Sequence, residues 1–186
     1  MKLLIMGPPG VGKGTQAECI KNELRLVHLS TGEILRAEVD AKSVIGINAK
    51  VYMDFGRLVP DNILIQIVKE HISKSDCQNG YILDGFPRTL PQAKGLDEMM
   101  HSIGHELECA ISLTADEDEL VDRLINRGKE SGRSDDTPDV IRNRQKIYWE
   151  QTAPLLDFYH DKGILKEVDG LGEIPEITKR ILDVLK

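Results

Sequence analysis

The sequence of 186 residues has few cysteines, no long apolar run and no excess of basic residues. Cys19, Cys77 and Cys109 are far apart in the chain and form no Cys-x-x-Cys pair, so neither a disulfide framework nor a zinc site is indicated. A net charge of -7 argues against a protein that coats nucleic acid or anionic membrane through a basic surface. Any anion-binding site must therefore be local.

No apolar run approaches the length that crosses a bilayer, and the first expected strand has no charged leader or cleavage site before it. We therefore expect a cytoplasmic protein, in keeping with the few cysteines. With 40% apolar residues, the chain can form one well-buried core and needs no second independent domain. Nothing in the sequence requires a partner subunit, so we expect a monomer.

Short apolar runs alternate with longer segments of helical period. The expected strands are residues 3–6, 26–29, 81–83, 109–113 and 164–168. These runs are continuously apolar, which indicates burial on both faces. The pattern predicts an α/β fold, with a parallel sheet covered by helices on both faces.

Helix boundaries are also predicted by local signals. Ser30 and Glu33 have the spacing of a capping box, which predicts a helix to residue 39 and a helical excursion to residue 59. Asp61 is expected to cap a helix that runs to about residue 74. A further helix over 116–127 should end at Gly128, before a flap at 128–138 that is rich in glycine, serine and aspartate.

The segment GPPGVGKGT, residues 7–15, lies directly after one expected strand and directly before a helical pattern. Glycines let a backbone approach a ligand and turn its N–H groups toward phosphate oxygens, and the helix N-terminus adds partial positive charge. Lys13 would reach the outer phosphates. A plain strand-to-helix turn is the alternative, but it needs neither the lysine nor so many glycines.

This loop departs from the usual phosphate-binding pattern, because Gly14 occupies the position of a Ser or Thr hydroxyl. Moving that hydroxyl to Thr15 rotates it by roughly 100° around the helix, which should prevent the usual direct bond to magnesium. We expect the metal to be held mainly by phosphates and water, with Asp84 holding those waters. The alternative is that Asp84 only caps a turn. The missing side chain at position 14 also leaves room for a second phosphate-bearing substrate.

Several arginines lie near the loop and the flap in an otherwise acidic chain. An isolated arginine is most simply explained as a solvated ion pair with one of the 31 acidic residues. Arginines that gather around a phosphate loop instead suggest bidentate phosphate binding and neutralisation of charge during phosphoryl transfer. The residues in question are Arg88, Arg123, Arg127, Arg133 and Arg144.

Five blocks of the sequence resemble the signature motifs of adenylate kinases, in the order of that family. They read GPPGVGKGTQ from residue 7, LSTGEILR from 29, GRLVPD from 56, DGFPRTLPQA from 84 and SGRSDD from 131. The resemblance covers nearly the whole chain. It implies a P-loop containing core of five parallel strands (1–29, 60–126 and 138–186), an AMP-binding region at 30–59 and a lid at 127–137. The lid is short and holds no cysteine, which resembles the short-lid form without zinc.

The resemblance also implies roles for individual residues. Those matching the ATP site are Gly10, Val11, Gly12, Lys13, Gly14, Thr15, Arg123, Arg127 and Gly172. Those matching the AMP site are Thr31, Arg36, Arg57, Leu58, Val59, Gly85, Phe86, Pro87, Arg88, Gln92, Arg133 and Arg144. Those expected to act in catalysis are Lys13, Arg88, Arg127, Arg133 and Arg144, with Asp84 bound to Mg²⁺ through water. A cis peptide bond before Pro87 is implied as well.

The implied reaction is reversible transfer of the γ-phosphoryl group of Mg-ATP to AMP, giving two ADP. A UMP/CMP kinase shares the fold and the arginines, but Thr31 and Gln92 favour adenine as the acceptor base. A P-loop nucleotide-binding switch is the more distant alternative, and it would usually carry an Asn-Lys-x-Asp element that is absent here. GTP as the donor stays open. We expect the five histidines to be surface or packing residues.

Overall fold

The computed structural model describes residues 1–131 and 137–186. Its core is a five-stranded parallel sheet, within these described residues, in the order β2-β3-β1-β4-β5. The strands are β1 (Lys2–Met6), β2 (Val27–Ser30), β3 (Tyr81–Asp84), β4 (Cys109–Thr114) and β5 (Leu165–Asp169). Each lies within about one residue of its predicted bounds, so the predicted α/β fold is confirmed.

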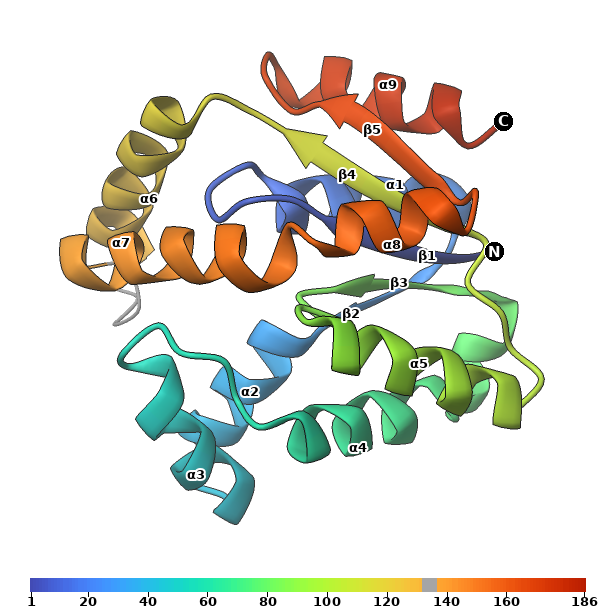
Figure 1. Ribbon diagram of the computed structural model, residues 1–186, viewed down its shortest axis with the longest axis horizontal. Helices are drawn as coiled ribbons and strands as arrows, with labels where there is room; N and C mark the ends of the chain where they lie inside the picture. The colour runs from blue at the N-terminus through green and yellow to red at the C-terminus, as the bar shows by residue number, and fades with distance from the viewer. Residues whose placement is uncertain (132–136) are drawn as a thin grey trace.

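Helices cover both faces of the sheet (Figure 1). The helical elements are α1 (Lys13–Leu24), α2 (Thr31–Asp40), α3 (Val44–Met53), α4 (Asp61–Ile72), η1 (Ser75–Asn79), α5 (Leu90–Ser102), α6 (Glu117–Ser131), α7 (Pro138–Ile147), η2 (Tyr148–Thr152), α8 (Leu155–Asp161) and α9 (Ile174–Val184). Helices α1 and α9 pack on one face through a cluster that includes Ile20 and Ile181. Helices α4, α5 and α8 pack on the other face, around Ile72, Leu96 and Tyr159.

The alternation of buried residues along the strands explains this layering. Leu3 and Ile5 of β1 belong to the α1 and α9 side, whereas Leu4 and Met6 belong to the opposite side. All four side chains are at most 4% exposed. A strand with apolar residues at successive positions needs both of its faces covered, and both faces of β1 are covered by helices.

Helices α2 and α3 form a small layer below the sheet in Figure 1. Ser30 caps α2, because its side chain accepts a hydrogen bond from the backbone N–H of Glu33 at 3.4 Å. The predicted cap and helical excursion are therefore confirmed. The layer returns to the core at α4.

Two predicted helix boundaries were wrong. The N-cap of α4 is Pro60 and not Asp61, and the Asp61 carboxylate bonds to Gln92 of α5 instead. Helix α6 does not end at Gly128 but continues to Ser131. A single glycine costs a helix only about 1 kcal/mol, which a helix with a well-buried face such as Leu120 and Leu124 can absorb.

Candidate functional site

The glycine loop connects β1 to α1 at the carboxyl edge of the sheet. Gly10 and Gly12 have φ angles of 92° and 96°, which other residues adopt only with strain. A β-carbon at Gly10 would also lie 2.7 Å from the carbonyl oxygen of Leu120. Glycine at these positions therefore lets the loop close around a space in front of α1.

Lys13 begins α1 and folds back over this loop. Its Nζ donates hydrogen bonds to the carbonyl oxygens of Gly7 at 2.8 Å and Pro8 at 2.9 Å. Burial lowers the pKa of Lys13, the charge of Asp84 opposes this, the charges of Arg88, Arg144 and Arg127 add to it, and the net result is a pKa of about 7. An anion in this space would favour the charged form of Lys13.

Asp84 ends β3 and is buried at the same edge of the sheet. Although burial acts to raise the pKa of Asp84, its hydrogen bond with His28 and the charge of Lys13 hold that pKa below the usual value. A β-carbon at Gly14 would lie 3.7 Å from Asp84 Oδ2. Asp84 is therefore an ionised carboxylate that faces the start of α1.

His28 of β2 lies between two carboxylates. Its Nε2 is 3.3 Å from Asp84 Oδ2, its Nδ1 is 2.9 Å from Glu18 Oε1, and its side chain is only 3% exposed. Burial acts to lower the pKa of His28, but the hydrogen bonds with Asp84 and Glu18 outweigh burial and raise it. We did not predict this arrangement. The sequence held one signal for it: His28 stands on the strand next to β3, two residues before the partner of Asp84.

The residues at this edge fit a magnesium ion that is held largely by substrate oxygens. Magnesium prefers oxygen ligands and usually keeps several waters, and Asp84 supplies one ionised carboxylate beside Gly14. Within residues 1–131 and 137–186, no three His, Cys, Asp or Glu side chains cluster closely enough to hold a metal by themselves. Phosphates and water would have to complete the coordination.

A cavity of about 420 Å³ opens in front of the glycine loop. Its wall contains most of the residues predicted for the donor phosphates. They are Gly10, Gly12, Lys13, Gly14, Thr15 and Arg127. The same wall also contains Asp84, predicted for the metal, and Arg88 and Arg144, predicted for the AMP site. Segments that are more than 100 residues apart in the sequence thus line one cavity.

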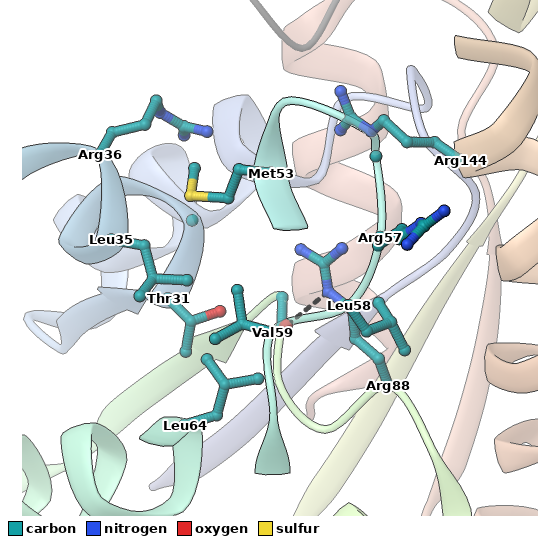
Figure 2. A pocket seen from close by; sticks show the side chains of 13 residues that line it. Thr31, Leu35, Arg36, Met53, Arg57, Leu58, Val59, Leu64, Arg88 and Arg144 are labelled. Atoms are coloured by element: carbon teal, nitrogen blue, oxygen red, sulfur yellow. Dashed lines mark hydrogen bonds between the residues drawn. The ribbon is translucent and has the colours of Figure 1, made fainter. Parts of the chain in front are cut away.

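A smaller cavity, of about 70 Å³, adjoins the first one. Figure 2 shows Thr31, Leu35, Met53, Val59 and Leu64 along its wall. These side chains come from α2, α3, α4 and the segment before α4. This part of the wall combines apolar surface with one hydroxyl, which suits a flat base with few polar contacts.

Arginines line the boundary between the two cavities. Arg36, Arg88 and Arg144 belong to the walls of both, as does Gly85 (Figure 2). The Arg57 guanidinium instead lies 5.7 Å from the centre of the Phe55 ring, so the backbone of residues 57–59 is the part suited to ligand contact. Two anionic ligands in the adjoining cavities would meet between these guanidinium groups.

Side chains hold the Arg88 backbone from both sides. Its N–H donates to Gln92 Oε1 at 2.7 Å, and its carbonyl oxygen accepts from Thr152 Oγ1 at 2.8 Å. The Arg88 side chain also donates from Nε to the Gly85 carbonyl at 2.7 Å, the dashed line in Figure 2. The peptide bond between Phe86 and Pro87 is cis, as the resemblance implied.

The structure does not bring every predicted residue to a cavity. Val11, Phe86 and Gln92 are at most 1% exposed and line neither of the two cavities. Arg123 pairs with Glu119 at 2.8 Å, and Gly172 also lies outside both walls. Arg133 lies outside the described residues. The binding roles of all these residues stay predictions.

Conversely, both cavities have wall residues that we did not predict. They include Glu18, Glu33, Leu35, Met53, Leu64, Tyr148 and Thr152. Most are apolar or common polar residues, whose approach to a cavity depends on the packing of distant elements. No helix in the described part of the chain combines the length and apolarity that a membrane span requires.

Comparisons with known proteins identify the family to which the chain belongs. The family model described as "Adenylate kinase" matches residues 5–164. An adenylate kinase of Nocardioides sp. strain JS614 is 48% identical over 185 residues, covering 100% of this chain and 97% of the relative. Adenylate kinases of Leptospira biflexa (49% identical, 97% of each chain) and Stenotrophomonas maltophilia strain R551-3 (46% identical, 100% of each chain) are similarly close. The chain belongs to the adenylate kinase family.

Proposed function

We propose that the enzyme catalyses reversible transfer of the γ-phosphoryl group of Mg-ATP to AMP, giving two ADP, and so maintains the balance of adenine nucleotides. The observation that carries this proposal is the pair of adjoining cavities with Arg36, Arg88 and Arg144 on their common boundary. A hydrolase or a nucleotide-dependent switch needs one phosphate site, whereas transfer between nucleotides needs two.

The larger cavity is the donor site. We assign the ATP phosphates to the loop residues Gly10 to Thr15, with Lys13 as the cationic contact and Arg127 beside it. Backbone N–H groups at the start of a helix favour phosphate oxygens, and the tight glycine loop allows that close approach. Arg123 and Gly172 are assigned to the outer part of the donor site on the family resemblance alone.

The smaller cavity is the acceptor site. We assign the AMP base to the surface formed by Leu35, Met53, Val59 and Leu64, with Thr31 as its polar contact. The AMP phosphate is assigned to Arg36, Arg88 and Arg144. With this assignment, the acceptor phosphate would lie next to the transferred group.

The reaction forms a bond between an AMP phosphate oxygen and the γ-phosphorus, and it breaks the bond from that phosphorus to the β,γ-bridging oxygen of ATP. No general base is needed, because the second pKa of a phosphate monoester is about 6 and the attacking oxygen is largely ionised at neutral pH. Catalysis then depends on alignment and on neutralisation of charge by Lys13, Arg88, Arg127 and Arg144.

Magnesium bound with the ATP phosphates supplies further positive charge to the transferred group. Asp84 is the side chain that would orient the metal's water ligands, since it is ionised and faces the start of α1. We propose that residues 127–137 act as the lid, with Arg133 reaching the transferred group on closure. Exclusion of water matters because an exposed γ-phosphate would otherwise be hydrolysed.

We further propose that the enzyme acts as a monomer, because both cavities are built from residues of one chain. We also propose that it is cytoplasmic, in keeping with its few cysteines. The UMP/CMP kinase alternative is not favoured, since the matching family model and the relatives cited above are adenylate kinases.

The experiment that tests this proposal measures, with purified enzyme, how much ADP is formed for each AMP consumed. Two ADP should appear for each AMP consumed, and ADP formation from Mg-ATP without AMP should be negligible. ADP formation that ignores AMP, or the release of inorganic phosphate, would contradict direct transfer between two bound nucleotides.

A further inference from the structure

Gln92 of α5 is a fully buried amide at the centre of a chain of hydrogen bonds. Its Nε2 donates to Asp61 Oδ1 at 2.6 Å, and its Oε1 accepts from the backbone N–H of Arg88 at 2.7 Å. Asp61 begins α4, directly after the wall of the smaller cavity, and Arg88 lies on the boundary between the cavities. The chain of bonds therefore links two parts of the acceptor site.

The chemistry of the two neighbours fixes which way the Gln92 amide points. An ionised carboxylate can only accept hydrogen bonds, and a backbone N–H can only donate. If the amide were rotated by a half turn, its oxygen would face Asp61 and its NH₂ group would face the Arg88 N–H. Both contacts would then be repulsive around the buried amide of Gln92, where unpaired polar groups are costly.

We propose that Asp61 is a positioning residue of the acceptor site. Asp61 orients the Gln92 amide, Gln92 holds the Arg88 backbone, and the Arg88 guanidinium is thereby aimed at the AMP phosphate. This inference rests on the proposed function of that site.

Asp61 has a second structural property that must be separated from this role. It lies in the first turn of α4, where a carboxylate interacts favourably with the helix dipole. Asp61→Asn removes the negative charge but keeps an oxygen that can accept from Gln92. Asp61→Ala removes both. A role through the hydrogen bond predicts that the two variants behave differently.

We expect Asp61→Ala to lower kcat/KM for AMP by about 10- to 100-fold, because small displacements of an aligning group are costly, while KM for ATP stays unchanged. Asp61→Asn should stay within about 3-fold of the unmodified enzyme, since the hydrogen bond from Gln92 is largely preserved. Equal losses in both variants, or an equal rise in KM for ATP, would overturn the proposal.

Exchanging the hydrogen-bond donor and acceptor between Gln92 and Asp61 gives a sharper test. Gln92→Glu places a carboxylate against Asp61 and should impair AMP turnover. Adding Asp61→Asn places an amide donor opposite the new carboxylate, which can then accept from that amide and from the Arg88 N–H. We expect the double variant to recover most of the activity lost in Gln92→Glu. A double variant that is as impaired as the single one would overturn the proposal.

A measurement that does not depend on catalysis can be made even on variants whose stability has changed. It also tests this inference separately from the proposed function. In nitrogen-15 NMR, the Gln92 side-chain amide protons should exchange slowly with water in the unmodified enzyme, faster in Asp61→Asn and fastest in Asp61→Ala. Equal exchange in all three proteins would overturn the inference, whatever the enzyme's substrate. Absence of AMP-dependent ADP formation by the unmodified enzyme would instead overturn the proposed function.

Discussion

Gly14 and Asp84 face each other across the start of α1, such that a β-carbon at position 14 would lie 3.7 Å from Asp84 Oδ2. This distance is an ordinary van der Waals contact, so a methyl group could be accommodated by the protein itself. Many phosphate loops carry a Ser or Thr at this position. Crowding within the protein therefore does not explain why residue 14 is a glycine. Substrate phosphates and the water ligands of magnesium are the groups that would use this space.

Gly14→Ala should consequently reduce activity without reducing stability. Alanine is favoured over glycine in a helix by roughly 0.5–1 kcal/mol, so the melting temperature should stay constant or rise. The methyl group would crowd the substrates, and we expect ADP formation to fall by about 10-fold or more. Gly95→Ala, on α5 and outside both cavities, is the matched control. Unchanged turnover in Gly14→Ala would show that the space is not used.

Arg88→Ala tests the boundary between the two cavities. Loss of a guanidinium that neutralises charge in the transition state should lower turnover by roughly 100- to 1000-fold, with the fold intact. Arg142→Ala is the control, because that side chain is 73% exposed and pairs only with Asp139 among the contacts described for it. Steady-state rates at saturating ATP and AMP, together with circular dichroism spectra, provide the comparison. Near-normal turnover in Arg88→Ala would place the phosphates elsewhere.

Thr31→Ala tests the choice of acceptor base. Thr31 Oγ1 lies on the wall of the smaller cavity and donates to the Asp84 carbonyl at 3.3 Å, which leaves its lone pairs available to a ligand. We expect the preference for AMP over UMP to narrow by about 10-fold while transfer continues, since one polar contact to a base is lost. Thr114→Ala is the control, because the Thr114 hydroxyl also donates to a backbone carbonyl, that of Val168 at 3.5 Å, but lies outside both cavities. An unchanged AMP/UMP ratio of kcat/KM would argue against a role for Thr31 in base choice.

His28→Gln tests the buried arrangement of Glu18, His28 and Asp84. Removing a charged donor from between two carboxylates should destabilise the fold by roughly 1–3 kcal/mol, or a few degrees in melting temperature for a chain of this size. His160→Gln is the matched control, because the His160 side chain is 79% exposed.

The stability difference for His28→Gln should also depend on pH. The pKa of His28 is raised in the folded protein, so its contribution is complete below the ordinary histidine pKa of about 6.5 and is lost as pH rises through the raised value. At the acidic end, the contribution declines as pH falls through the lowered pKa values of Asp84 and Glu18. Melting temperatures from pH 2 to 9, in buffer without nucleotide or magnesium, measure both limits. A difference that is constant over this range would contradict the charged arrangement.

The sequence predicted the sheet well because β1, β3 and β4, at its centre, are short runs of mainly apolar, buried residues. Burial on both faces leaves little ambiguity about such a segment, and even the edge strand β2 is displaced by only one residue from its expected bounds. Glycine was a less reliable signal. Gly128 reads as a helix end, but the buried face of α6 carries the helix through it to Ser131.

Within the site, residues in contiguous motifs were predicted and residues joined by tertiary packing were not. Lys13 and Gly14 share one loop, and Asp84 and Arg88 share another, so spacing alone brings each pair together. The contact of His28 with Glu18 and Asp84 depends on how α1, β2 and β3 pack. The burial of Gln92 between Asp61 and Arg88 likewise depends on the packing of α4 against α5.

The most direct test of the account is a coupled assay of ADP formation from Mg-ATP, with AMP, CMP, UMP and GMP offered separately as acceptors. The two-cavity site predicts ADP formation that depends on AMP and far exceeds the rate with any other acceptor. Equal or greater activity with CMP or UMP would contradict the assignment of the smaller cavity to AMP. Slow ADP release that is indifferent to all four acceptors would contradict phosphoryl transfer itself.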